Sequence, residues 1–464
     1  MKRIKYLIIP TSLALWFFPA SCEEFVEVPV PDDRIVSESV FSNDKTAESA
    51  VQGIYNELIS TAFSSGYQSS VTVQAALSAD NLQTTNSNAT LLEFQENEIF
   101  VDNEGNLAIW ASAYNIIYMT NAVVEGLEHS ENITAELKDK LMGEALFLRA
   151  FTYFYLVNLY GDVPLILVTN YSQNATASRT PDVEIYDQIT QDLDDATGLL
   201  SADYEKGERL RANQFTAMAL MARVQLYRGM WEQAEYWSNR VIESGTFSLL
   251  PDLDAVFLAN SEEAIWQISP SADGSNQSST NEGGIFIMDD YLETVALTDD
   301  LIAQFEPNDN RLKQWSGHFD TDSDRYYFAF KYKVKYATGE PYEYSMVLRL
   351  AEQYLIRSEA RARQENLSGA VEDLNLIRRR ANAALIPAGQ PDINQTVLLD
   401  LILKERRKEL FTEWGHRWLD LKRYEKADSV LAPKKSLWEA TDVLYPIPEE
   451  EIQKDFNLSQ NQGY

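Results

Sequence analysis

Helix-forming segments recur in pairs along this chain, and the spacing within each pair is the feature that most limits how it can fold. In the clearest pair, a segment containing Ala222 is followed by Gly229, Trp231 and Ala234. The small side chains of Ala222 and Ala234 allow two antiparallel helices to approach closely, and Gly229 permits the turn between them. This spacing is typical of tetratricopeptide repeats. Stacked pairs of this kind bury one face and leave their loops to carry function.

Two further pairs are less regular. The second carries its repeat residues at Tyr354, Ser358, Leu367 and Ala370. Glu365 stands where the first pair has its turn glycine. The segments 136–160 and 183–200 would form a third pair. We therefore expect divergent repeats stacked in a right-handed array.

Apolar residues at intervals of three and four predict helices over most of the chain. The first helix begins near residue 43, where Ser42 or Asn43 can cap its N-terminus. The other strong helices are expected at 107–128, 135–159, 182–200, 213–228, 231–244, 347–364, 368–383 and 395–424.

Two long stretches break this helical periodicity. Residues 61–100 are rich in Ser, Thr, Asn and Gln, and residues 257–345 contain a polar, glycine-bearing loop at 269–284. Loops of this length within a compact protein are usually functional or disordered. Alternation within 326–336 predicts a pair of strands. The predicted fold class is mainly α, a tetratricopeptide-like helix-pair array with a loop-rich, partly β second subregion.

The N-terminus has the pattern of a bacterial lipoprotein signal. Three basic residues within the first five positions precede an apolar run at 6–18, and small residues lie directly before Cys22, the single cysteine. A membrane-spanning helix needs roughly 20 apolar residues, more than this run provides. We therefore expect cleavage before Cys22 and attachment of lipid to its thiol. The alternative is a chance cysteine in an ordinary secretory signal.

The chain is strongly acidic. It has 71 Asp and Glu residues against 39 Lys and Arg residues, which gives a formal net charge of −32 at pH 7. Nucleic-acid binding requires clustered basic side chains that release phosphate counterions, so the composition argues against this class of function. Anionic lipid would repel the body of the protein for the same reason. We expect membrane contact through the lipid anchor alone.

The chain is longer than one small core usually supports, which predicts two packed subregions. The stretch after Cys22 contains Pro29 and Pro31 and shows no helical period, as is typical of an extended linker. We divide the chain into a signal peptide at 1–21, an acidic extended leader at 22–40, an N-terminal helical region at 41–256, a loop-rich variable ligand-binding insert at 257–346 and a C-terminal helical region at 347–464.

The sequence LKERRKELFTEWGHRWLDLKR at 403–423 resembles the C-terminal signature of the SusD/RagB family, the surface nutrient-binding lipoproteins of Bacteroidetes. The leader CEEFVE at 22–27 is also similar to the start of that family, where acidic residues after the lipidated cysteine accompany export to the cell surface. Further similar segments follow the family order over nearly the whole mature chain, at 147–156, 159–164, 186–189, 192–193, 349–360, 445–448 and 460–464.

The resemblance implies a non-catalytic protein that binds oligosaccharide or polysaccharide. It also implies an outer-membrane location facing the cell exterior and a role as the lid of a TonB-dependent, SusC-like transporter for nutrient uptake. The RagB branch of the family suggests peptide instead of glycan. A helical-repeat scaffold whose concave surface binds only protein is the alternative from a different class. Glycan affinity of the isolated protein would separate the scaffold from the binder.

The charged residues of the C-terminal signature have a structural interpretation. Arg406 lies on an apolar stripe of its predicted helix, where an unpaired charge would carry a large desolvation cost. Glu413 and Arg417 are spaced as an i,i+4 pair. We expect Glu405, Arg406, Glu413 and Arg417 to form an ion network that locks the helices and not to bind ligand.

Signals for catalysis and for metal binding are weak. The chain has three histidines and lacks the HExxH, GxSxG and phosphate-loop motifs, although a glycosidase would need only two suitable carboxylates. We expect no enzyme activity and no cofactor. Asp320, Asp322 and Asp324 match the opening of a calcium loop, but Arg325 replaces its glycine and Lys331 its closing carboxylate. A solvated acidic turn is favoured over structural Ca²⁺.

A sugar offers an apolar C–H face and a rim of hydroxyls, so its binding site needs exposed aromatic rings beside amides and carboxylates. In the family that this chain resembles, variable loops build the ligand face, and residues 61–100 and 257–330 are the loops rich in aromatic and amide side chains here. Tyr291 and Trp315 could instead cover the core of the smaller subregion. The ligand-binding candidates are Tyr67, Asn81, Gln83, Phe286, Tyr291, Trp315 and Tyr326.

Overall fold

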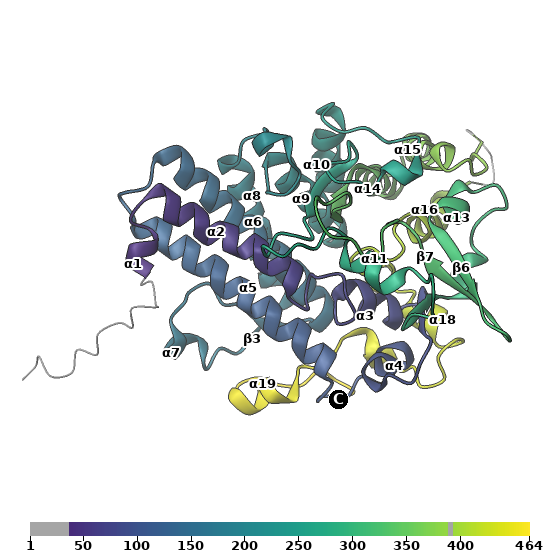
Figure 1. Cartoon of the computed structure of the whole chain (residues 1–464), viewed down its shortest axis with the longest axis horizontal. Helices are drawn as coiled ribbons and strands as arrows, with labels where there is room; N and C mark the ends of the chain where they lie inside the picture. Colours follow the sequence, from purple (N-terminus) through teal and green to yellow (C-terminus); the bar gives the residue numbers. More distant parts are fainter. Residues whose placement is uncertain (1–36, 388–392) are drawn as a thin grey trace, which may run out of the picture.

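The computed structural model describes residues 37–387 and 393–464. The signal peptide, Cys22 and most of the acidic leader lie outside these residues, so lipidation stays a prediction. The fold is mainly α, as the sequence predicts, and its long helices dominate the view in Figure 1.

The long helices follow the predicted ranges closely, because their apolar residues recur at helical spacing. Asn43 caps the first of them, as predicted, by accepting a hydrogen bond from the Thr46 amide at 3.2 Å. The long helices are α2 (Asp44–Ser60), α5 (Glu104–His129), α6 (Ala135–Tyr160), α8 (Asp182–Leu199), α9 (Gln214–Tyr227), α10 (Trp231–Glu243), α14 (Leu350–Arg363), α15 (Leu367–Arg380) and α16 (Gln395–Glu409).

Shorter helices lie within the connecting segments. They are α1 (Ser37–Val40), α3 (Val71–Ser78), α4 (Ala89–Glu96), α7 (Tyr171–Asn174), α11 (Asn281–Phe286), α12 (Asp299–Ile302), α13 (Asn310–Gln314), α17 (His416–Arg423), α18 (Ala427–Leu431) and α19 (Glu449–Lys454). The 3₁₀ turns are η2 (Glu205–Gly207), η3 (Leu253–Ala255) and η4 (Ala440–Val443).

The three predicted helix pairs are present. α6 packs on α8, α9 on α10, and α14 on α15, and the pairs follow one another across the molecule in Figure 1. Gly229 has a φ of +71° in the turn of the second of these pairs, and Glu365 has a φ of +64° in the turn of the third. The turn therefore imposes the left-handed conformation even where the chain has no glycine to relieve its strain.

Two predicted ranges are wrong. Residues 61–100 are not one long loop, because Ser70 and Asn88 cap the helices α3 and α4 within them. The helix predicted at 395–424 is interrupted between α16 and α17. Gly415 has a φ of +68° at the break, and a Cβ atom there would lie 2.7 Å from the Ala75 side chain of α3. Close packing against α3 therefore requires glycine at this position.

An antiparallel sheet with the strand order β1-β5-β7-β6 joins the two stretches that break the helical periodicity. β1 (Leu82–Thr84) comes from the first stretch and pairs with β5 (Val295–Leu297) of the second. The strand pair predicted within 326–336 is half right. β7 (Arg325–Ala329) is a strand, but it pairs with β6 (Ser316–Asp320), which precedes it, and residues 330–336 lie outside the strands.

Two smaller sheets complete the β structure of the described residues. β4 (Ala264–Ile268) pairs with β8 (Ser345–Arg349), and β2 (Val163–Pro164) pairs with β3 (Arg179–Thr180). Since β8 extends to Arg349, α14 begins three residues later than the helix predicted at 347–364.

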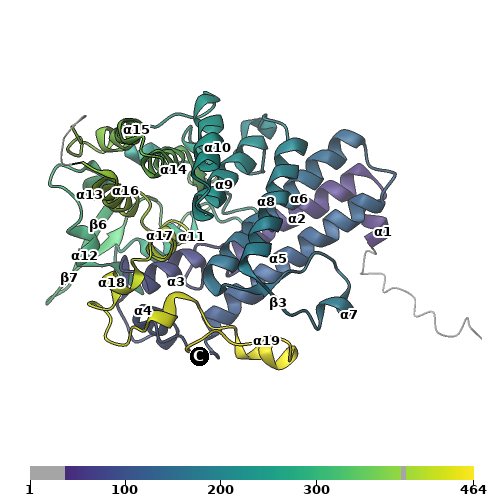
Figure 2. The same cartoon turned by 180° about the vertical axis from the view of Figure 1, so that it is seen from behind.

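A large hydrophobic core runs from Phe41 to Leu458, and a second cluster lies among α14, α15 and α16, which Figure 2 shows side by side. By length and composition α5 resembles a membrane-spanning helix, but it packs against α2 and α6 with half of its apolar window buried, so we interpret it as a core helix. The division of the chain at 40, 256 and 346 stays a prediction.

Candidate functional site

Four charged residues of the C-terminal signature, Glu405, Arg406, Glu413 and Arg417, form ion pairs in the interior, as expected, but not with one another. Glu413 and Arg417 do not pair, because the break between α16 and α17 removes the i,i+4 geometry that the sequence suggested. Three of their partners come from distant segments, and the partner of Arg406 is Asp420 of the same signature. The pairs are Glu405–Arg311 (2.6 Å), Arg406–Asp420 (2.7 Å), Glu413–Arg349 (2.8 Å) and Arg417–Asp80 (2.7 Å).

Electrostatics support a structural role for this network. Burial opposes ionisation of Glu405, but the charges of Arg311, Lys408 and Arg378 outweigh burial and lower the pKa of its carboxyl to about 2. The ion pairs therefore hold the helices together in the interior, away from any ligand in solvent.

Three of the ligand-binding candidates are wrong, because their side chains are buried. Trp315 is fully buried, and its Nε1 donates a hydrogen bond to the Leu253 carbonyl at 3.0 Å. Phe286 lies in the core within α11. Asn81 accepts a hydrogen bond from Arg407 at 2.9 Å and is also buried. None of these side chains can meet a sugar without unfolding its surroundings.

Two further candidates lie on the four-stranded sheet and do not line either cavity described below. Gln83 is half-buried on β1, opposite Ala296 of β5. Tyr326 is half-buried on β7 and packs against a small apolar cluster that includes Phe328. The structure therefore brings neither of them to Tyr67, and their role as ligand contacts stays a prediction.

Tyr67 lines a cavity of about 570 Å³, which we call the tyrosine groove. Loop residues near 67, the polar loop at 269–284 and the segment 335–338 form its walls. The full lining is Tyr67, Gln277, Ser279, Thr280, Asn281, Gly284, Lys335, Tyr336, Ala337 and Thr338.

Exposed aromatic rings stand at this groove. Tyr67 is 50% exposed and Tyr336 is 69% exposed. Tyr291, which the sequence suggested, is also half exposed and lies next to the lining, with its ring 4.2 Å from Lys335 Nζ. A hydrogen bond to Tyr291 raises the pKa of Tyr336. Tyr67 and Tyr291 come from different predicted loops, so the fold brings these two candidates to one region.

Amide side chains fix the shape of the tyrosine groove. Asn281 Nδ2 donates a hydrogen bond to the Ser65 carbonyl at 2.9 Å, and Gln277 Nε2 donates to the Ser279 carbonyl at 2.8 Å. The first bond ties the loop near Tyr67 to the loop at 269–284. Rings held in this way beside amides and hydroxyls can pack on the C–H face of a sugar and bond its hydroxyls.

Sequence reasoning missed Tyr336, Gln277 and Asn281. Gln277 and Asn281 lie in the polar loop that the sequence analysis singled out, so its amides were the available signal. Tyr336 lay inside a predicted strand, and nothing in its local sequence distinguishes it from the neighbouring, buried Tyr332.

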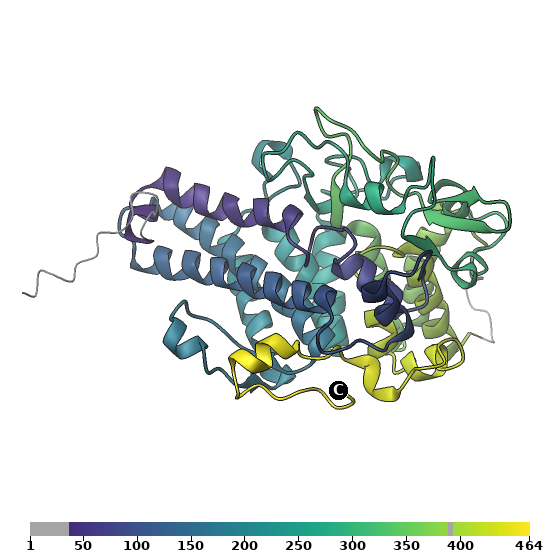
Figure 3. The same ribbon diagram turned by 60° about the horizontal axis from the view of Figure 1, so that its bottom comes forward.

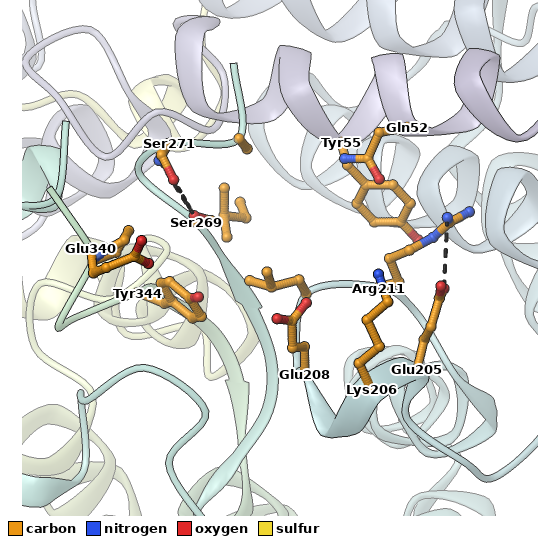
Figure 4. Close-up of a pocket in the computed structure, with 14 residues that line it drawn as sticks. Gln52, Tyr55, Glu205, Lys206, Glu208, Arg211, Ser269, Ser271, Glu340 and Tyr344 are labelled. Atoms are coloured by element: carbon orange, nitrogen blue, oxygen red, sulfur yellow. Dashed lines mark hydrogen bonds and ion pairs between the residues drawn. The ribbon is translucent and has the colours of Figure 1, made fainter. Parts of the chain in front are cut away.

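A second cavity of about 380 Å³, shown in Figure 4, is lined by α2, η2 and the loops that follow β4 and precede β8. Arg211 lies on one side of it, and its guanidinium pairs with buried Glu144 at 2.5 Å. Burial raises the pKa of the Glu144 carboxyl to about 7, although Arg211 acts in the opposite direction. Tyr344 lies on the opposite side of the cavity from Arg211 (Figure 4).

The structure gives the calcium prediction no support. Asp320 pairs with Arg325 across the hairpin of β6 and β7, with contacts of 2.6 and 2.9 Å. Within 37–387 and 393–464, no three His, Cys, Asp or Glu side chains are grouped so that they could hold a metal ion. The acidic turn at Asp322 and Asp324 is exposed to solvent.

A stack of divergent helix pairs that presents a loop-built groove with exposed tyrosines defines a helical-repeat binding protein. A family model described as starch-binding and associating with the outer membrane matches residues 32–226, and a SusD family model matches residues 320–440. The two matches together span more than half of the chain. This chain belongs to the SusD/RagB family, as the sequence signature implied.

Among the relatives of this chain, some match its whole length and others match only a part. A SusD-like protein of Formosa agariphila is 26% identical over 523 aligned residues, which cover 100% of both chains. The starch-binding protein SusD of Bacteroides thetaiotaomicron is 35% identical over 130 residues, which are 25% of this chain and 21% of that protein.

Solved structures show the same fold. A SusD superfamily protein from Bacteroides vulgatus has a TM-score of 0.81 at 19% identity, covering 91% of this chain and 100% of that one. A laminarin-binding SusD-like protein has a TM-score of 0.75 at 23% identity, with the same coverage of the two chains. At these identities the likeness concerns the fold alone.

Proposed function

We propose that this protein is a non-catalytic glycan-binding lipoprotein of the outer membrane. It captures oligosaccharide or polysaccharide at the cell surface and acts as the lid of a TonB-dependent, SusC-like transporter for nutrient uptake. The observation that carries the proposal is the tyrosine groove, where Tyr67 and Tyr336 stand in solvent beside amide and hydroxyl groups. Relatives named as starch-binding and laminarin-binding proteins support glycan as the ligand class.

The chemistry of the groove suits a hydroxyl-rich ligand. A tyrosine ring packs on the C–H face of a sugar while its hydroxyl stays in water. The ammonium of Lys335 is already matched by Asp289 and by Glu293, the latter at 2.8 Å, so it does not demand an anionic ligand. The remaining polar groups of the groove are uncharged.

Binding experiments with single variants test the glycan site. Losing one stacked ring is expected to cost on the order of 1 to 2 kcal/mol, so Tyr67→Ala and Tyr336→Ala should each weaken glycan binding about tenfold. Tyr118→Ala is the matched control, because Tyr118 is 54% exposed on α5 and lines neither cavity. Calorimetry with soluble starch, laminarin, xylan and mannan provides the measurement.

The same panel separates the alternatives. If all three variants bind the best glycan with the same affinity as the parent protein, the tyrosine groove is not the binding site. A parent protein that binds peptides and none of the glycans would favour the peptide-binding role instead. No reducing sugar should be released from any bound glycan, and its release would contradict the non-catalytic role.

The transporter role has a separate test. A tethered binder improves capture only when it is held beside the pore, where effective concentration replaces diffusion. Gentle, low-salt extraction in detergent should therefore recover the protein together with a large β-barrel transporter. Recovery of the protein alone would favour a free binder.

A further inference from the structure

We propose that the cavity in Figure 4 is a second subsite of the same ligand face and that its two unpaired carboxylates restrict the ligand to uncharged glycans. This inference rests on the proposed function and adds a substrate class to it. It concerns a cavity that shares none of its lining residues with the tyrosine groove.

The two cavities lie next to each other along the same pair of loops. The Ser278 amide donates to the Ala337 carbonyl at 3.0 Å, and Gln277 pairs with Thr338 in an isolated antiparallel bridge. Thr338 lines the tyrosine groove and Glu340 lines the second cavity. Since only Gly339 lies between them, their Cα atoms lie at most about 7 Å apart. A ligand that extends along this bridge is therefore within reach of both cavities.

The second cavity carries groups that a sugar unit can use. Tyr344 presents a half-buried ring, and Figure 4 shows Glu340 beside it. Ser269 and Ser271 add hydroxyls, whose oxygens lie 3.2 Å apart. Carboxylates accept hydrogen bonds from neighbouring hydroxyls of a sugar ring, and a tyrosine ring covers its C–H face. The cavity therefore offers both halves of sugar recognition.

Two carboxylates at this cavity have no partner within the described part of the chain. Neither Glu208 nor Glu340 forms a hydrogen bond or an ion pair through its side chain there, and both are exposed. Both lie close enough to Tyr344 to raise the pKa of its hydroxyl, after the larger effect of burial. They are free to accept hydrogen bonds from a ligand.

Of the two cations that line the cavity, Arg211 is already paired and Lys206 is not, in the part of the chain that the structure describes. Arg211 is held by buried Glu144 at 2.5 Å. Within the described residues the Lys206 side chain forms no hydrogen bond or ion pair; the pKa of the adjacent Glu205 is lowered first by its hydrogen bond to Lys140 and last by the charge of Lys206. A ligand unit with a carboxylate or sulfate group would meet two unpaired carboxylates against one unpaired ammonium, on a protein whose formal net charge is −32. A uniformly uncharged chain meets no such repulsion.

The experiment compares each neutral polysaccharide with its own sulfated derivative. Soluble starch, laminarin, xylan and mannan are titrated into the parent protein, and the best binder is then tested as its sulfated form. We expect at least tenfold weaker binding of the sulfated form. The double substitution Glu208→Gln and Glu340→Gln should reduce this discrimination about tenfold. Glu449→Gln with Glu450→Gln on α19 changes the net charge equally, away from the cavity, and should leave the discrimination unchanged.

Chain length gives a second readout. Tyr344→Ala should weaken binding of long oligosaccharides about tenfold and leave binding of a disaccharide unchanged, because a disaccharide fills only one subsite. Melting curves identify a Tyr344→Ala protein that fails to fold, and the charge variants then decide.

Figure 3 places α19 and the C-terminal tail at the opposite edge from the loops of 257–346, so the control substitutions lie on another face.

Each outcome has one meaning. If no glycan of the panel binds, the proposed function falls and the subsite with it. If binding depends on Tyr336 but neither Tyr344→Ala nor the charge variant differs from the parent protein, only the second subsite is overturned. Stronger binding of the sulfated form by the parent protein would overturn the charge restriction.

Discussion

Trp315 offers the most direct test of how this molecule is built, because its local sequence suggests a ligand contact and its position makes it part of the core. The indole is fully buried, its ring centroid lies 5.5 Å from that of Phe257, and Lys331 Nζ lies 4.8 Å from the ring. Its Nε1 donates to the Leu253 carbonyl at 3.0 Å. Trp315→Ala would remove all of these contacts at once.

The expected cost follows from those contacts. Removing a buried tryptophan side chain typically costs about 3 to 5 kcal/mol of the free energy of unfolding. Losing the hydrogen bond to the Leu253 carbonyl, which then keeps only the Val256 amide at 3.4 Å, adds about 1 kcal/mol, and losing the cation–π contact with Lys331 adds roughly 0.5 to 2 kcal/mol. The sum is roughly 4.5 to 8 kcal/mol, a large fraction of the roughly 5 to 15 kcal/mol that stabilises a typical protein.

Urea denaturation followed by fluorescence or circular dichroism measures this cost. Trp315→Phe keeps most of the ring and loses the N–H donor, so it should cost roughly 1 to 2 kcal/mol. Tyr336→Ala at the exposed groove should change the free energy of unfolding by less than about 0.5 kcal/mol. A Trp315→Ala protein that unfolds at the same urea concentration as the parent protein, with weakened glycan binding, would refute the reasoning.

Three further predictions concern other regions. Burial raises the pKa of the Glu282 carboxyl to about 7 from the usual 4.5. The carboxyl therefore stays protonated in the folded protein at pH values where it is ionised in the unfolded chain, and the free energy of unfolding decreases as the pH rises from about 4.5 to about 7. The melting temperature of Glu282→Gln minus that of the parent protein should therefore increase between about pH 5 and about pH 8. A difference that does not change with pH would contradict this. Calcium should leave the melting temperature unchanged, because Asp320 already pairs with Arg325; a rise with calcium that Asp322→Asn abolishes would contradict this expectation. Cys22→Ser should move the protein from the membrane fraction to the soluble fraction, and added protease should digest the parent protein on intact cells; an unchanged membrane fraction would refute the lipid anchor.

The sequence alone was enough to predict helices, helix caps and helix breaks, because each of these depends on residues close together in the chain. The apolar spacing of α9 and α10 and the small residues Ala222 and Ala234 predict a helix pair from thirty consecutive residues. The cap at Asn43 is equally local, because the side chain bonds an amide three residues away. The break at Gly415 had a local signal too, since glycine within a helix costs about 1 kcal/mol relative to alanine.

Tertiary structure alone decided which aromatic side chains meet solvent. Trp315 is buried because Leu253 and Phe257, some sixty residues earlier in the chain, lie against it. Tyr67 and Tyr336 line one groove only because the loops that carry them pack together. An aromatic residue has the same sequence character in a core and in a binding site, since both require the same apolar surface.

The ion pairs too were predicted only in part from the sequence. The sequence alone indicated that Arg406 and Arg417 need acidic partners, because an unpaired charge in the interior is costly. It did not indicate which partners, since Arg417 binds Asp80 across 337 positions. Periodicity fixes the faces of helices through neighbouring residues, whereas the pairing of buried charges and the exposure of rings depend on segments that meet only when the chain has folded.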